Sequence, residues 1–89
     1  MPMVQFAKAF RRHVACPHLE VPGSTVREAL DAYFAQHPAA RSYALDEHGA
    51  VRKHVNVFVG DQQVADRVGL TDAVSPHTII HVFQALSGG

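Results

Sequence analysis

The N-terminal stretch of the sequence alternates apolar and polar residues, which predicts a β-strand. In MVQFAKAF, the even-numbered positions are apolar except for Lys8. A period of two residues places alternate side chains on opposite faces of a strand. The apolar face would carry Val4, Phe6 and Phe10. A shorter alternation in HLEVPG stops at Pro22-Gly23, so we expect a second strand that forms a hairpin with the first.

The stretch STVREALDAYFAQHP changes to helical periodicity. Thr25 followed by Glu28 fits a capping box, in which the two side chains accept hydrogen bonds from the free backbone N–H groups of the first turn. One apolar stripe recurs at helical spacing, and we expect it to pack against a sheet. The stripe consists of Val26, Ala29, Leu30, Tyr33 and Phe34. Pro38 cannot continue the helix, which is therefore expected to end just before it.

The region after the helix is ambiguous before the period of two returns. We expect Tyr43 and Leu45 to be buried, and residues 46–49 to form a turn. The stretch VRKHVNVFVGDQQV then predicts a strand with Asn56 and Phe58 on one face. The opposite, apolar face would carry Val55, Val57 and Val59. Gly60-Asp61 is typical of a tight reversal into a further short strand.

The last strand is predicted by TIIHVFQAL. Ile80 and Val82 share one face, and Ile79, His81 and Phe83 share the other. The order strand, strand, helix, strand, short strand, strand indicates an α+β protein with two layers. Parallel pairing of the first and last strands would give the β-grasp topology, a mixed sheet of four to five strands packed on one main helix.

Length and composition narrow the class of protein. The chain has 89 residues, enough for one small domain, and 47% of them are hydrophobic, which excludes wholesale disorder. The formal net charge is zero, so nothing favours a nucleic-acid or membrane-surface partner. No apolar run is long enough to span a bilayer. With Cys16 alone, no internal disulfide can form, and we expect a cytoplasmic, reducing compartment.

The sequence contains no convincing catalytic or metal motif. No Ser-His-Asp order, supported Cys-His pair or glycine-rich phosphate loop is present. The seven histidines raise the alternative of a metal site, but His77 and His81 bracket the start of a strand and their spacing carries no ligand geometry. We therefore expect neither a bound metal nor a bound cofactor.

The end of the sequence, Ser87-Gly88-Gly89, carries the chemically suggestive feature. Together with the segments AFRRH, HVNVFVGDQQV and VGLTDAVSPHTIIHVFQALSGG, it resembles the ubiquitin-like sulfur carriers. These include the small subunit of molybdopterin synthase and the carriers of thiazole and cysteine biosynthesis. The resemblance covers nearly the whole chain and is densest from His54 onward.

This resemblance implies that the protein is a co-substrate and not an enzyme. Gly89 would be adenylated at its carboxylate and converted to a thiocarboxylate, and Gly88 would give the tail access to a narrow active site. An adenylating enzyme of the ubiquitin-activating type would bind the ATP, and a synthase would accept the sulfur. We expect a β-grasp domain over residues 1–85 and a flexible tail over residues 86–89.

A carrier also needs a surface that its partners recognise. Phe58 and Phe83 each lie opposite the small apolar residues of their strand, and Leu86 precedes the tail. We expect these three residues to bind the partner, because exposed aromatic side chains are common interface hot spots. The alternative is that either phenylalanine belongs to the core.

Two other functions fit the same residues. A ubiquitin-like modifier would share the adenylate but would join its terminal carboxyl group to a lysine of a target protein. A plain β-grasp interaction domain would make no use of the two terminal glycines.

Overall fold

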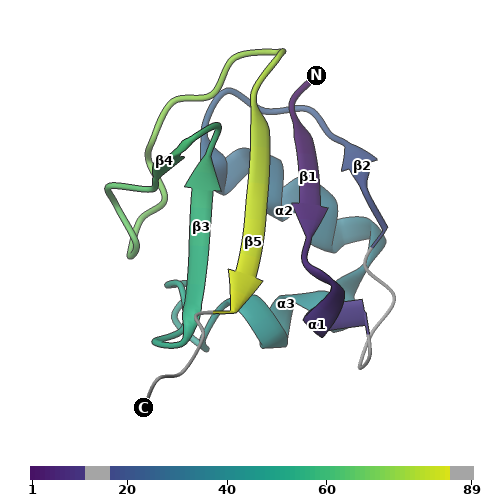
Figure 1. Cartoon of the computed structure of the whole chain (residues 1–89), viewed down its shortest axis with the longest axis vertical. Coiled ribbons are helices and arrows are strands. Elements are labelled where there is room, and N and C mark those ends of the chain that lie inside the picture. The colour runs from purple at the N-terminus through teal and green to yellow at the C-terminus, as the bar shows by residue number, and fades with distance from the viewer. Residues whose placement is uncertain (12–16, 85–89) are drawn as a thin grey trace.

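The computed structural model, shown in Figure 1, describes residues 1–11 and 17–84 and contains one five-stranded mixed sheet. The strand order is β2-β1-β5-β3-β4, in which β1 and β5 run parallel and the other neighbours run antiparallel. The strands are β1 (Met3–Phe6), β2 (Leu19–Glu20), β3 (Val55–Val59), β4 (Gln62–Gln63) and β5 (Ile79–Gln84). The parallel central pair is the one expected from the sequence.

Three helices accompany the sheet. They are α1 (Lys8–Arg11), α2 (Val26–Gln36) and α3 (Pro38–Ala44). In Figure 1, α2 crosses behind the sheet and α3 lies behind it near the end of β5. Since α2 and α3 both lie behind the sheet, it has one covered face and one open face. The predicted α+β architecture and β-grasp topology are confirmed.

The predicted first strand is too long, because the chain turns into α1 after Phe6. The ladder between β1 and β5 ends where Ala7 N donates to Val82 O at 2.9 Å, and Phe10 N then donates to Ala7 O at 3.1 Å. A continuing strand would have pointed Lys8 into the core beside Phe6, whereas the helical turn leaves it exposed. Phe10 is still buried, as predicted, but it reaches the core from α1.

The hairpin of β1 and β2 is confirmed, with Met3 opposite Glu20. Its connection, residues 12–16, lies outside the described residues. Glycine is required just after β2, where Gly23 has φ of +146° and a Cβ atom would lie 2.8 Å from Ala29 N. This close approach seats the chain against the first turn of α2.

The start of α2 is capped almost as predicted. Thr25 Oγ1 accepts a hydrogen bond from Glu28 N at 3.2 Å, while Glu28 Oε1 accepts from Ser24 N at 2.8 Å. The returning bond therefore goes to Ser24, one residue before the cap. It is the main cause that lowers the pKa of Glu28.

All five residues of the predicted helical stripe are buried. Tyr33 stacks on Phe6 with ring centroids 5.0 Å apart, and Phe34 meets Tyr33 edge to face at 5.6 Å. The Tyr33 hydroxyl donates to Pro17 O at 2.8 Å, so its polar end is satisfied. This aromatic group forms the centre of the covered face.

Helix α3 was not predicted. Pro38 ends α2 as expected, but it also occupies the first position of α3, where its fixed φ suits a helix start. Ala40 and Ala44, four residues apart, face the core. Tyr43 lies off that face and is 38% exposed, so its predicted burial is wrong, whereas Leu45 is buried as predicted.

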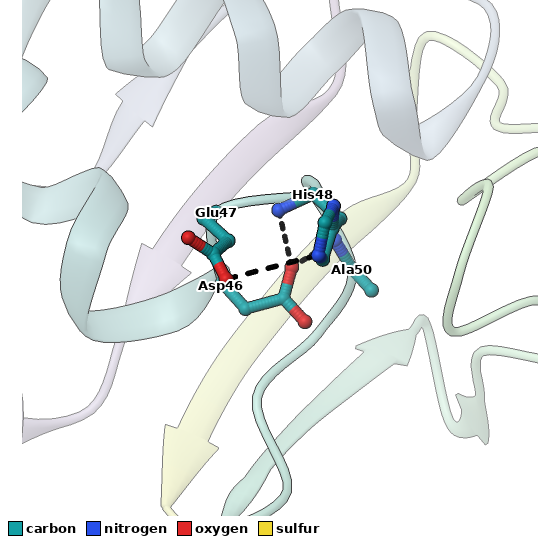
Figure 2. A network of polar contacts seen from close by, with 4 residues as sticks. All are labelled: Asp46, Glu47, His48 and Ala50. Carbon is teal, nitrogen blue, oxygen red and sulfur yellow. Dashed lines mark hydrogen bonds and ion pairs between the residues drawn. The ribbon is translucent and has the colours of Figure 1, made fainter.

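The predicted turn after α3 is confirmed and is shown in Figure 2. Asp46 Oδ1 accepts hydrogen bonds from His48 N at 2.8 Å and from Ala50 N at 3.0 Å. The bond from Ala50 is the largest of the causes that lower the pKa of Asp46. The turn returns the chain so that Leu45 pairs with Val51 in an isolated antiparallel bridge.

The segment between β4 and β5 is held by side-chain hydrogen bonds. Asp66 accepts hydrogen bonds from Gly69 N at 2.8 Å and from Thr71 Oγ1 at 2.7 Å.

Arg27 of α2 ties this segment to the helix. It donates to Gly49 O at 2.8 Å and to Val68 O at 3.0 Å. These bonds seat the fully buried Leu70, which adopts a left-handed backbone conformation with φ of 55°.

Candidate partner-binding site

The open face of the sheet is built by the residues that alternate with the core. On β5, Ile80 and Val82 are buried, so Ile79, His81 and Phe83 project to the opposite face. β3 follows the same rule: Val55 and Val57 are buried, and Asn56 and Phe58 alternate with them. The two faces of both strands are therefore those predicted from the sequence.

Phe58 and Phe83 contact each other on this open face. Their ring centroids are 5.2 Å apart with the planes inclined by 50°. In the register of β3 and β5, Phe58 lies opposite His81 and Asn56 lies opposite Phe83, so the rings are diagonal neighbours. Both rings are half-buried and neither belongs to the hydrophobic core. The alternative that placed either ring in the core is wrong.

Polar side chains surround this aromatic pair. Gln5 of β1 lies opposite His81, and Gln63 of β4 lies opposite Phe58. Gln63 Nε2 donates to Asn56 Oδ1 at 3.0 Å, which fixes one edge of the aromatic patch. An apolar centre with a polar rim is the usual composition of a protein–protein interface.

A groove of about 350 Å³ adjoins the pair where β1 passes into α1. Its polar lining comes from Gln5, Lys8, His18 and His81, and Phe83 closes one side. The lining also includes Ala7 and parts of the core residues Phe6 and Val82. Sequence reasoning missed this groove. The available signal was Lys8, a charged residue at a position where the first predicted strand should have an apolar side chain.

The site lies at the end of the sheet from which the chain continues toward its last residues. Phe83 directly precedes Gln84, the final residue of β5, and Figure 1 places α1 at this same end. Leu86, Gly88 and Gly89 lie outside the described residues, so their predicted roles stay predictions. The same holds for the predicted boundary between domain and tail.

The described residues contain no group of three or more histidine, cysteine or acidic side chains placed to hold a metal ion. No helix among residues 1–11 and 17–84 has the length and apolarity that crossing a bilayer requires. The open face carries an aromatic centre with hydrogen-bonding side chains around it.

Comparisons with protein-family models and with curated proteins give no match. Solved structures do match over nearly the whole chain. One is a chain of the Amycolatopsis orientalis BexX/CysO complex, with 24% identity, full coverage of both chains and a TM-score of 0.83. The fold is the ubiquitin-like β-grasp.

Two further structures support this assignment. Small archaeal modifier protein 1 of Haloferax volcanii is 27% identical, covers 99% of this chain and 98% of its own, and has a TM-score of 0.76. Mycobacterium tuberculosis CysO is 19% identical, covers 97% of this chain and 100% of its own, and has a TM-score of 0.81. The Haloferax volcanii protein is a modifier protein by its name, and the fold that these structures share with this chain is consistent with the ubiquitin-like sulfur carrier family expected from the sequence.

Proposed function

We propose that this β-grasp protein is a sulfur carrier that reacts through the carboxylate of Gly89. In the first step the carboxylate attacks the α-phosphate of ATP on a partner enzyme, forming an acyl-adenylate and releasing pyrophosphate. A sulfur donor at the oxidation level of sulfide then attacks the acyl carbon. The C–S bond forms, the C–O bond to phosphate breaks, and AMP leaves. The resulting thiocarboxylate is the nucleophile that a synthase consumes.

The observation that carries this proposal is the outward-facing pair of Phe58 and Phe83. Phe83 is the penultimate residue of β5, so a partner that covers the pair also stands beside the point where the tail begins. Docking on this surface would supply free energy that offsets the entropy lost when the tail is ordered in an active site. The folded body would thus serve to present the reactive end.

The residue type at the end of the chain suits this chemistry. An enzyme that adenylates a carboxylate must enclose it and exclude water. Gly88 and Gly89 have no side chain, so they can enter a channel that admits only backbone. The BexX/CysO complex, in which a chain of this fold is found with a second protein, supports the idea that such a domain acts through partners.

Conjugation to other proteins is the second candidate, and one comparison favours it. The Haloferax volcanii neighbour, a modifier protein, is 27% identical to this chain, against 24% for the chain of the BexX/CysO complex. A modifier would use the same adenylate, but the acyl group would end in an isopeptide bond to lysine. The two functions therefore differ only after activation.

Intact-mass measurement of the protein purified from its native host distinguishes the two functions. A carrier gives a species in which one oxygen is replaced by sulfur, and this species disappears after alkylation and hydrolysis of the thiocarboxylate. A modifier instead gives adducts with larger proteins that persist in denaturant. A chain lacking Gly89 is the matched control and should show neither species. A sulfur-containing species in that control would overturn the proposal.

A further inference from the structure

The groove beside Phe83 is lined by side chains that donate hydrogen bonds. Lys8 brings an ammonium group and His81 an imidazole, and none of the described residues that line the groove is acidic. Gln5 adds an amide at the same wall. On a chain whose formal net charge is zero, Lys8 gives this part of the surface a local positive charge.

Such a lining is complementary to a carboxylate. A lysine ammonium and an imidazole N–H both donate to carboxylate oxygens, and hydrogen bonds to a charged group are the stronger ones. Glu20, the nearest acidic residue in the sheet register, lies opposite Met3 on the outer side of β1 and does not line the groove. Among the described residues, none brings a carboxylate into the groove, so an acidic side chain of another molecule would find Lys8 and His81 as hydrogen-bond donors.

The position of the groove indicates which molecule would supply that side chain. Phe83 belongs both to the aromatic pair and to the groove wall, so the two form one continuous surface. This surface lies at the end of β5, where the chain continues toward Gly89. In the proposed function, a protein that holds Gly89 works at this end of the domain, whereas a second copy of this chain has no such requirement.

We propose that the groove receives a glutamate or aspartate side chain of the adenylating partner, and that this contact with Lys8 and His81 orients the carrier for activation of Gly89. This inference rests on the proposed function and adds the chemistry of the partner's contact. The contact would act on association and leave the chemical step unchanged, since Lys8 does not touch the reacting carboxylate in this scheme.

The test is ATP–pyrophosphate exchange by the ubiquitin-activating-type enzyme of the native host, with the full chain as substrate. Lys8→Glu should raise the KM for the carrier about tenfold and Lys8→Gln about threefold, with kcat unchanged. Lys8→Arg should stay within about twofold of wild type because it keeps the charge. Arg41→Glu, which reverses an exposed charge on α3, is the matched control and should also stay within about twofold.

Ionic strength provides a second readout. Added salt should raise the KM of the wild-type chain more steeply than that of Lys8→Gln, because an ion pair is screened and a neutral contact is not. Thermal melts of each variant establish that the fold is intact.

Two results would decide against us in different ways. If wild type drives exchange but Lys8→Glu matches Arg41→Glu, the acidic contact is wrong and the carrier function stands. If wild type drives no exchange at all, the proposed function itself fails.

Discussion

The two faces of the sheet put the same residue type to opposite uses. On the covered face, Phe34 of α2 packs against Phe6 of β1, with ring centroids 6.1 Å apart, and is almost fully buried. On the open face, Phe58 packs against Phe83 with no helix over it and remains half-buried. Both pairs are formed by close ring contacts. The difference is that the first pair is enclosed by the fold, while the second is left for another molecule to enclose.

This contrast separates stability from function within one small sheet. Burial of apolar surface on the covered face supplies most of the free energy of folding. An aromatic pair kept half-exposed stabilises the domain less than the same pair in the core would. We infer that it is maintained for binding, because enclosed aromatic side chains dominate many interfaces.

The largest expected effect comes from breaking the covered face. Phe34→Ala should lower the free energy of unfolding by about 3 kcal/mol or more, since it removes a buried ring and leaves a cavity. Denaturant titration followed by circular dichroism measures this loss. A loss below about 1 kcal/mol would mean that the covered face does not carry the stability as we describe.

Arg27→Ala tests how the loops are tied to the covered side. The substitution removes the donors to Gly49 O, Val68 O and Gly69 O, and we expect the free energy of unfolding to fall by about 2 kcal/mol. Amide hydrogen exchange should also become faster around Leu70. Arg41→Ala, on an exposed part of α3, is the control and should change stability by less than about 0.5 kcal/mol. Equal losses in the two variants would contradict the assignment.

Phe58→Ala is the counterpart on the open face. We expect it to lower the free energy of unfolding by only about 1 kcal/mol. It should raise the KM for the carrier in ATP–pyrophosphate exchange about tenfold, as loss of an interface anchor does. The reverse outcome, a large loss of stability with an unchanged KM, would make the pair a structural element and would remove the basis of the proposed docking surface.

The smallest effect concerns pH. Hydrogen bonds, chiefly from Gly69 N, lower the pKa of Asp66 below its ordinary value of 3.8. A depressed pKa in the folded state gives stability that is present above the unfolded value and is lost as pH falls through the folded value. Asp66→Asn should therefore be less stable than wild type at neutral pH, and the gap should narrow below about pH 4. Asp31→Asn, at an exposed position of α2, is the control, and thermal melts across pH measure both variants.

Local patterns were sufficient for the parts of the fold that depend on one periodic element. The alternation around Ile80 and Val82 predicted both faces of β5, and the spacing from Val26 to Phe34 predicted the buried side of α2. They failed for α3, whose core contacts are the small side chains of Ala40 and Ala44 and give only a weak apolar stripe. Arg27 and Gly69 are 42 residues apart, so no local pattern could reveal their hydrogen bond.

The candidate site shows the same division. The outward direction of Phe58 and Phe83 followed from the parity of their strands. The groove did not, because it needs the end of β1, the first turn of α1 and β5 to meet. Lys8 seemed to interrupt a strand only while α1 was unknown. A charged residue at a position where the alternation calls for an apolar one thus indicates that the strand has already ended.

The measurement that tests the central claim most directly is a sulfur-transfer reaction with purified components. The chain, its adenylating partner, ATP and a sulfide donor are incubated, and the intact mass of the chain is measured. We predict that wild type exchanges one oxygen for sulfur, while chains that lack Gly89 or carry Gly88→Val remain unchanged. Sulfur acquired equally by either variant, or by none of the three chains, would contradict the account.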